Sequence, residues 1–554
     1  MKAYEALGAV LHSLGVTTVF GVLGDGNLRF AVAARAAGIG YLAARHEASA
    51  VAMADAYARA RGQVGVATVT TGPGVTNAVT ALMEAVRSQT PVVLLTGAAS
   101  TSMEDYPQLM DQEAMAKSLG VGVVRFRSSR YLPTDLASAL RRAARERRPI
   151  MFSVPVDVQE DEVGDCPRAV PPASPGVVVP DRPTIEQVAG LIRASNRPVI
   201  LAGWGAWLAG AGEALRRLGE RTGAVLTTTA LTKGFWAGER ASVGVSGGFA
   251  SEEAATILGR ADLVLAFGAS LNRWTTRGGR MFPDAVVVQV DTSVAAFEHY
   301  LRGVVPVVGD AGATAELLLE CLGDLPAAST FAHEIDDERF TTARNGDPFT
   351  DASTETTIDP RTLTVHLREH LPPNAVVVQD SGAFVGFPGS YYEPARPGGY
   401  LFVQGFQTMG LGLALGVGVA AADPDALPVT LVGDGGLLMS LGELETIIRQ
   451  GTPHLVVVYN DSAYGAEVHI GGHHGFDTDI VRFPDTDFAA TARALGGEGF
   501  VVRGVADLEP LSTWLEDPRG LLLLDCRTEA HIASPFLGEV FKPALDAPRA
   551  QPVR

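Results

Sequence analysis

Two aspartates, Asp434 and Asp461, each follow an apolar run that is typical of a buried strand. Asp434 lies in a Gly-Asp-Gly-Gly turn after residues 428–432, and Asp461 follows the run at 454–459. Glycines let a backbone approach phosphates, and amides at a helix N-terminus point at anions. Two carboxylates at neighbouring strand ends could hold a hard divalent ion, such as magnesium, against a diphosphate. The alternative is that both are ordinary turn acids.

The elements that must position these acids are strands and helices in alternation. Short apolar runs alternate with alanine-rich helical patterns along nearly the whole chain. This pattern predicts the α/β class, with parallel sheets covered by helices on both faces. Two segments, 159–183 and 323–359, lack a clear apolar pattern and are interpreted as linkers. We therefore expect three doubly wound domains, 1–160, 182–322 and 358–535, and a tail, 536–554. The first and third domains could be built alike.

The composition restricts the class of partner. Among 554 residues, 62 acidic side chains outnumber 44 basic ones, for a formal net charge of −18. This acidity disfavours nucleic acid or an anionic membrane as the main partner. No apolar run is long enough for a bilayer, and the N-terminus lacks a signal-peptide pattern. The spacing of Cys166, Cys321 and Cys526 suits neither a metal nor a disulfide framework, so we expect a cytoplasmic protein.

The separation of the two aspartates, 461 − 434 = 27 residues, resembles the thiamine-diphosphate motif of the acetolactate synthase, pyruvate decarboxylase and pyruvate oxidase group. In that motif Gly-Asp-Gly is followed by an asparagine, where this chain has Asp461. Aspartate keeps an oxygen ligand but adds a negative charge. The resemblance implies Asp434, Asp461 and the Ala463 carbonyl as magnesium ligands. It also implies cofactor contacts by Gly433, Gly435, Gly436, Tyr464 and Gly465.

A second stretch, 44–57, resembles the helix that carries the activating glutamate of the same family, here Glu47. The family role is a hydrogen bond to the aminopyrimidine ring, which promotes proton removal from the thiazolium carbon. Alone, Glu47 could simply favour the helix dipole. Residues 70–77 resemble the Gly-Pro-Gly loop near that ring, with Gly72, Pro73 and Asn77. Since the family places these two halves on different subunits, the resemblance implies a homodimer or homotetramer with the active site at the subunit interface.

A third stretch, 405–413, resembles the segment that places a bulky apolar side chain under the cofactor. Met409 takes that place, although it could be an ordinary core methionine. The Gln407 carbonyl would meet the cofactor's amino group, at a position where relatives often have glycine. Gly382 and Ala383 are candidates for further diphosphate contacts.

The residues that would select the reaction point in two directions. Asp25 lies in a loop resembling that of pyruvate decarboxylases, and Glu467 falls where those enzymes have an acid/base glutamate. Their histidine pair is absent before the 460s; we interpret His473-His474 as part of a surface loop and leave the role of His469 open. Gln112 lies in a segment resembling acetolactate synthases, as a neutral orienter or a plain helix residue. We expect a lyase or transferase, a decarboxylase or carboligase, acting on a 2-oxo acid with an aldehyde or ketone acceptor.

The sequence leaves three alternatives open. The turn Gly203-Trp204-Gly205 after an apolar run could hold a nucleotide, as in a flavin-assisted oxidase, although FAD is not favoured. A nicotinamide site would need a third glycine at the right spacing, and Gly210 is too distant. A non-catalytic regulatory relative is disfavoured because Glu47 and both metal acids are present.

Overall fold

The N-terminal domain contains a parallel sheet of six strands in the order β2-β1-β3-β4-β6-β5. The computed structural model describes residues 1–103, 105–164, 176–323 and 330–541. Among them, no helix has both the length and the apolar character needed to cross a membrane. The strands are β1 (Thr18–Gly21), β2 (Gly40–Ala43), β3 (Gly65–Val69), β4 (Val92–Ala98), β5 (Gly122–Val124) and β6 (Ile150–Pro155). The helices are α1 (Ala3–Ser13), α2 (Leu28–Ala36), α3 (Glu47–Arg61), α4 (Pro73–Asn77), α5 (Val79–Arg87), α6 (Gln112–Ser118) and α7 (Leu132–Glu146).

The C-terminal domain repeats this topology. Its strand order, β14-β13-β15-β16-β18-β17, is the N-terminal order with new numbers, so the two outer domains are indeed built alike. The strands are β13 (Ala375–Gln379), β14 (Tyr400–Phe402), β15 (Leu427–Gly433), β16 (His454–Asn460), β17 (Glu498–Val502) and β18 (Leu521–Arg527). The helices are α15 (Pro360–His370), α16 (Gly386–Tyr391), α17 (Gly412–Ala422), α18 (Asp434–Ser440), α19 (Glu443–Gln450), α20 (Gly465–His473), α21 (Phe488–Leu495), α22 (Glu509–Glu516) and α23 (Pro535–Phe541).

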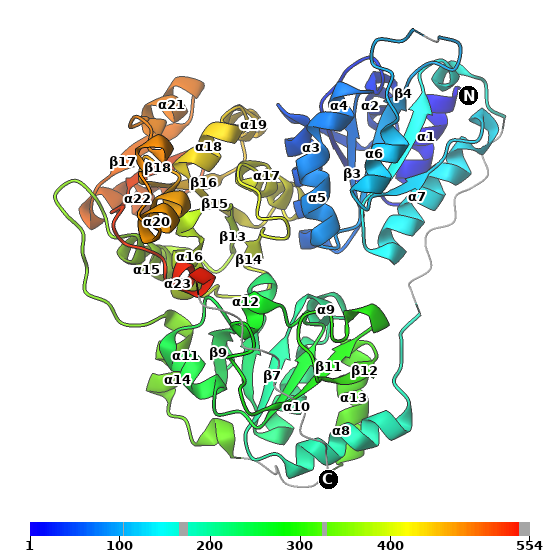
Figure 1. The fold of residues 1–554 in the computed structure, drawn as a ribbon. Helices are drawn as coiled ribbons and strands as arrows, with labels where there is room; N and C mark the ends of the chain where they lie inside the picture. The colour runs from blue at the N-terminus through cyan, green and yellow to red at the C-terminus, as the bar shows by residue number, and fades with distance from the viewer. Residues whose placement is uncertain (104, 165–175, 324–329, 542–554) are drawn as a thin grey trace.

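The central domain has a different strand order, β12-β11-β10-β7-β8-β9, which is the order of dinucleotide-binding folds. Its strands are β7 (Pro198–Ala202), β8 (Val225–Thr228), β9 (Ser242–Val245), β10 (Leu263–Phe267), β11 (Val286–Asp291) and β12 (Val305–Val308). Its helices are α8 (Arg182–Ala194), α9 (Trp204–Leu208), α10 (Gly212–Thr222), α11 (Glu252–Leu258), α12 (Arg273–Thr276), α13 (Ala311–Leu322) and α14 (Asp337–Asn345). The predicted α/β class with three parallel-sheet domains is confirmed (Figure 1).

The structure gives a role to two segments of the central region, the predicted linker at 323–359 and the glycine-rich turn at 203–205. The segment 323–359 is more than a linker, because α14 buries Phe340, together with Phe331, in the domain core. The glycines of the turn at 203–205, for which a nucleotide site was the less favoured interpretation, serve loop packing. A Cβ on Gly203 would lie 2.3 Å from the carbonyl oxygen of Gly268, and a Cβ on Gly205 would lie 2.7 Å from the Gly268 Cα. Close packing therefore accounts for both glycines without a ligand.

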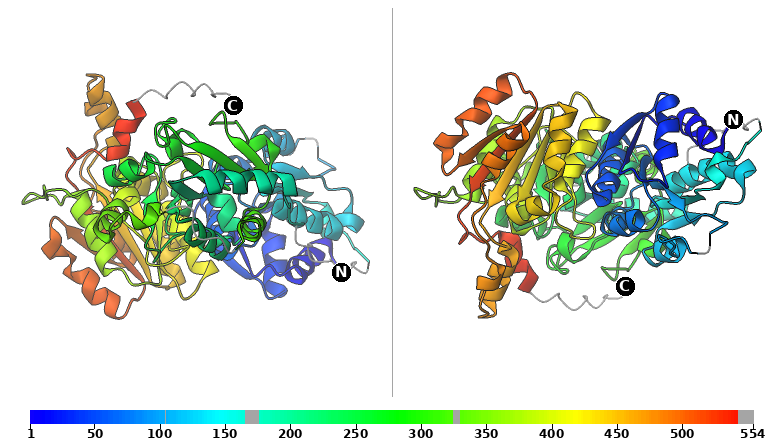
Figure 2. Two further views of the ribbon diagram at one scale, coloured as in Figure 1. Left: turned by 90° about the horizontal axis from the view of Figure 1, so that it is seen from below. Right: turned by 90° about the horizontal axis from the view of Figure 1, so that it is seen from above.

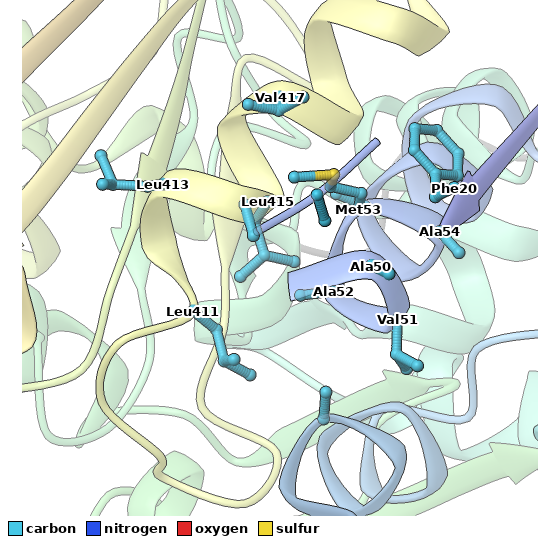
Figure 3. Close-up of a cluster of buried hydrophobic side chains, with 14 of the residues drawn as sticks. Phe20, Ala50, Val51, Ala52, Met53, Ala54, Leu411, Leu413, Leu415 and Val417 are labelled. Carbon is cyan, nitrogen blue, oxygen red and sulfur yellow. The ribbon is translucent and has the colours of Figure 1, made fainter. Parts of the chain in front are cut away.

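The two outer domains share one hydrophobic core, in which α17 of the C-terminal domain packs against α3 of the N-terminal domain. Figures 1 and 2 show these domains side by side, and Figure 3 shows Leu415 and Met53 between the two helices. The helices approach closely at Gly418, where an added Cβ would lie 2.3 Å from the Met53 carbonyl oxygen. Helix α3, which begins at Glu47, is thus fixed against the C-terminal domain of its own chain.

Replacing Gly418 with Ala is expected to destabilise the protein by about 1–3 kcal/mol, because the new methyl group overpacks the α3–α17 contact. Differential scanning calorimetry would show this as a lower Tm. The matched control is Gly190→Ala, in the exposed part of α8, where nothing lies within 4 Å of the new Cβ. That change should be neutral or stabilising, by up to about 1 kcal/mol. Equal shifts for both variants would contradict the proposed tight contact.

Candidate active site

The two aspartates lie at neighbouring strand ends. Asp434 is the first residue of α18, directly after β15, and Asp461 follows β16, the strand that pairs with β15. Asp434 is only 3% exposed. Burial, together with the charge of Asp461, raises the pKa of Asp434 to about 7. Burial likewise raises the pKa of Asp461 to about 6. The arrangement concentrates negative charge at the carboxyl edge of the sheet.

Asp434 has one oxygen without a partner. The backbone N–H of Gly435 donates to Oδ1 at 2.8 Å, whereas the buried Oδ2 has no hydrogen-bond partner. A buried carboxylate oxygen without a donor, next to a second carboxylate, is suited to a cation. Among the described residues, no group of three or more His, Cys, Asp or Glu side chains could hold a metal ion. The two acids and a backbone carbonyl are oxygen donors, the kind that suits magnesium, which commonly completes its ligand set with substrate phosphates.

The loop after Asp461 has a constrained backbone. Ser462 has φ +54°, a conformation that side chains rarely adopt. Its N–H donates to Asn460 Oδ1 at 3.2 Å, and Asn460 Nδ2 donates to Asp525 at 2.9 Å. A Cβ on Gly465 would lie 2.4 Å from Asp461 Oδ2. A Cβ on Gly435 would lie 2.6 Å from the Tyr464 ring. Both motif glycines are therefore needed for the close packing of this loop.

Glu47 lies at the N-terminus of α3, next to the Gly-Pro-Gly loop. Asn77, at the end of α4, donates through Nδ2 to Glu47 Oε2 at 3.0 Å. Gly72 adopts φ +64° and precedes Pro73, the first residue of α4. Glu47 is half-buried, while Asn77 and Pro73 are exposed. The structure thus brings together the predicted pyrimidine-side residues on an accessible surface.

The loop before α17 carries Gln407 and Met409. Gln407 has φ +57°, the left-handed conformation that favours glycine, the residue that relatives often have at this position. Met409 is half-buried. The N–H of Gly410 donates to Asp380 Oδ2 at 2.9 Å. Gly382 and Ala383 follow β13 in the chain. They lie close to the loop after Asp461, because a Cβ on Gly465 would be 3.1 Å from the Ala383 Cβ.

The two halves of this site come from different domains. Glu47 and Asn77 belong to the N-terminal domain, and Asp434 and Asp461 to the C-terminal domain. Among the described residues, no hydrogen bond joins either member of the first pair to either member of the second. We call the residues that each domain contributes a half-site.

Comparison with known proteins identifies both halves. The family description "Thiamine pyrophosphate enzyme, N-terminal TPP binding domain" matches residues 1–115. The central domain and the C-terminal TPP binding domain of the same family match residues 185–318 and 380–526. A probable 2-ketoarginine decarboxylase of Pseudomonas aeruginosa is 31% identical over 92% of this chain and 90% of its own length.

The chain belongs to the thiamine pyrophosphate enzyme family. Further relatives include the large subunit of acetolactate synthase isozyme 3 of Escherichia coli, 28% identical over 94% of this chain and 93% of its own length. A probable acetolactate synthase large subunit of Methanocaldococcus jannaschii is 29% identical over 85% of this chain and 84% of its own length. This thiamine pyrophosphate enzyme is a decarboxylase or carboligase, as predicted; an oxidase or a non-catalytic relative is not favoured.

Gln112 of this thiamine pyrophosphate enzyme is a buried loop anchor. Its Oε1 accepts the Gly72 N–H at 2.9 Å, and its Nε2 donates to the Gly97 carbonyl at 3.0 Å and to Ser153 at 3.4 Å. These protein partners occupy both ends of the amide. The contacts favour a role in holding the Gly-Pro-Gly loop over the predicted contact with substrate.

The other candidates for the reaction lie on the surface of the chain. Asp25 is exposed, with an oxygen 3.7 Å from Arg29, and Glu467 is exposed on α20. Their roles stay predictions. The predicted loop at His473-His474 is partly helical, because α20 ends at His473. His469, on the same helix, is half-buried, and burial lowers its pKa.

Sequence reasoning missed Asp380 as an anchor of the Met409 loop. It is fully buried at the end of β13, and burial raises its pKa to about 6. A Cβ on Gly412 would lie 2.7 Å from the Asp380 Cβ, and one on Gly436 would lie 2.6 Å from its Oδ2. The available signal was its position directly after an apolar strand, in the turn 380–383 that was interpreted only as a source of diphosphate contacts.

Replacing Asp461 with Asn, the family's usual residue, is expected to lower the pKa of Asp434, because one of its two causes of elevation disappears. Protons compete with Mg²⁺ for both acids, so wild-type affinity for Mg²⁺ should fall as the pH drops from about 8 to about 5. The variant should show a shallower fall, with at most one proton displaced per ion at this pair. Calorimetric titration with Mg²⁺ at saturating thiamine diphosphate measures both slopes. Identical slopes would show that Asp461 is not a ligand.

Proposed function

We propose that the chain is a magnesium-dependent 2-oxo acid decarboxylase or carboligase whose active site is completed by a second subunit. One observation carries this proposal: the partnerless Oδ2 of buried Asp434 lies at the turn where a diphosphate-bound cation is expected. Asp434, Asp461 and the Ala463 carbonyl would hold magnesium. FAD is not part of the proposal.

The residues divide the chemistry between the two half-sites. When bound, thiamine diphosphate supplies a nucleophilic carbon and an acceptor for the electrons released with carbon dioxide. Glu47 accepts the Asn77 N–H at Oε2, and its Oε1 would exchange a proton with the aminopyrimidine ring. Met409 would contact the cofactor as its apolar support. Glu467 and Asp25 remain the candidates for proton transfer to the product in the assembled site.

The dimer proposal is supported by the apolar side chains exposed around both half-sites. Phe406, Leu438 and Met439 are exposed beside the Met409 loop and α18. Leu23 and Leu109 are exposed in the N-terminal domain. Apolar surface of this kind is typical of surface covered by a partner. A second copy, placing its Glu47 against these acids, would complete two identical sites.

The experiment that tests the function measures cofactor binding, product and assembly together. Titration calorimetry with thiamine diphosphate, with and without Mg²⁺, tests the site. A panel of 2-oxo acids with small, aromatic, branched and guanidino side chains is then read by mass spectrometry for decarboxylation and coupling products. The guanidino acid is included because of the Pseudomonas aeruginosa relative. Light scattering reports the oligomer. Tight cofactor binding without any carbon–carbon chemistry would overturn the proposal.

A further inference from the structure

A buried glutamate of the N-terminal domain holds the Met409 loop of the C-terminal domain. Glu84, on α5, is 0% exposed. Its Oε1 accepts the Gly405 N–H at 3.0 Å, and its Oε2 accepts the Phe406 N–H at 2.6 Å. Ser88 also donates to Oε1, at 2.8 Å. The two amides directly precede Gln407, so the glutamate fixes the start of the loop.

A buried glutamate of the C-terminal domain makes the reverse contact. Glu443, the first residue of α19, is 1% exposed. Its Oε1 accepts the N–H groups of both Arg45 and His46, at 2.9 and 3.1 Å. Its Oε2 accepts the Thr446 hydroxyl at 2.7 Å. The two amides directly precede Glu47.

These contacts occupy equivalent places in the two like-built domains. Helix α5 lies in the crossover from β3 to β4, and α19 in the crossover from β15 to β16. Strands β3 and β15 both take third place in their sheets. The segments that are held precede α3 and α17, the helices that pack against each other. Each glutamate therefore reaches into the other domain at the equivalent point.

Arginines reinforce both contacts at the carbonyl side. Arg59, on α3, donates to the Phe402 carbonyl at 3.3 Å, at the end of β14. Arg449, on α19, donates to the Ala43 carbonyl at 2.6 Å, at the end of β2. Each strand end thus meets a guanidinium from the opposite domain, and the loop after it meets a carboxylate. Charge-assisted hydrogen bonds of this type are stronger than neutral ones.

We propose that Glu84 and Glu443 are reciprocal positioning residues, each of which fixes two backbone amides of the opposite domain directly before a cofactor-contacting segment. The inference rests on the proposed function. In the proposed dimer, Glu47 and Met409 of one chain serve different active sites. One pair of buried glutamates therefore sets the geometry of both sites from within a single chain.

The two positions differ in their tolerance of glutamine, and this difference gives a sharp test. Glu84 accepts a backbone N–H group on each of its two oxygens. In Glu84→Gln, the side-chain NH₂ would therefore face one of these N–H groups, and two donors would oppose each other. Glu443 accepts both N–H groups on one oxygen, so Glu443→Gln can keep them and meet the Thr446 hydroxyl with its NH₂. We therefore expect Glu84→Gln and Glu443→Ala to lose their hold on the backbone amides of the opposite domain. Glu443→Gln should keep these hydrogen bonds and behave like wild type. Glu220→Gln, an exposed acid on α10, is the control.

Hydrogen exchange of the cofactor-free protein directly measures how firmly Glu84 and Glu443 hold these backbone segments. Glu84→Gln should accelerate exchange at 403–411, and Glu443→Ala at 43–50, each at least about 10-fold. Kinetics of the loaded enzyme should then separate. Glu84→Gln should raise the Kd for thiamine diphosphate about 10-fold, whereas Glu443→Ala should lower kcat about 100-fold with that Kd nearly unchanged.

If Glu84→Gln does not fold, Gly405→Ala tests the same contact, because its new Cβ would lie 2.5 Å from Ser88 Oγ and displace the loop. Unchanged exchange in both segments would overturn the inference, as would a Glu443→Gln variant as defective as Glu443→Ala. Failure of the proposed function would look different: wild-type protein would bind no thiamine diphosphate, while the exchange results would still decide whether the glutamates hold the loops.

Discussion

Replacing Glu47 with Gln is expected to lower kcat by about 10³-fold while leaving the Kd for thiamine diphosphate within about 3-fold of wild type. Glutamine preserves the shape and can still accept the Asn77 hydrogen bond that Glu47 accepts at 3.0 Å. It cannot exchange a proton with the aminopyrimidine ring. The loss should therefore be confined to chemistry, and the folded structure and diphosphate grip should persist.

The measurement combines steady-state carbon dioxide release with calorimetric titration of the cofactor. A suitable control is Glu113→Gln, because Glu113 also lies in the first turn of a helix, α6, where it pairs with Lys117 and Arg125 at the surface. That variant should retain wild-type kcat. Near-normal turnover by Glu47→Gln would reject the assignment of Glu47 as activator, whatever its position in the fold.

The sequence was sufficient for those parts of the site that depend on short stretches of backbone. The apolar runs before Asp434 and Asp461 indicate adjacent parallel strands, and the structure pairs β15 with β16 at this point. Residues of one strand-turn-helix unit are positioned by local rules: strand length, glycine in the turn, and a helix start. The same is true of Glu47 at the start of α3.

The parts that could not be predicted depend on contacts between distant segments. The roles of Gln112 and Asp380 follow from the amides they meet, Gly72 and Gly410, which no local pattern reveals. The packing role of Gly203 appears only when the loop at Gly268 is placed against it. A polar residue in an apolar helix or strand end has the same sequence signature whether it meets substrate or backbone. Part of the predicted tail, 542–554, and Cys166 lie outside the described residues.

Replacing Asp434 with Asn is expected to stabilise the cofactor-free protein and abolish its stabilisation by thiamine diphosphate with Mg²⁺. In the folded chain the pKa of Asp434 is about 7, raised from 3.8 by burial and by Asp461. Between these pH values the folded state binds more protons than the unfolded state. The contribution of Asp434 to stability therefore falls as the pH rises from about 4 through about 7, and above that the buried charge is fully unfavourable.

Asparagine removes this charge, so the cofactor-free variant should exceed wild type in unfolding free energy at about pH 8 by on the order of 1–3 kcal/mol. Near pH 4, where the wild-type carboxyl is protonated, the difference should nearly vanish. Addition of Mg²⁺ and thiamine diphosphate should reverse the order at pH 8, because only wild type retains an anionic ligand whose Oδ2 is free. Thermal unfolding with and without ligands gives both comparisons, with half-buried Asp423→Asn, an acid in a surface ion pair with Arg396, as control. If the ligand-free variant were no more stable than wild type, Asp434 would not carry an unfavourable buried charge. If Mg²⁺ and thiamine diphosphate still stabilised the variant, Asp434 would not bind the metal.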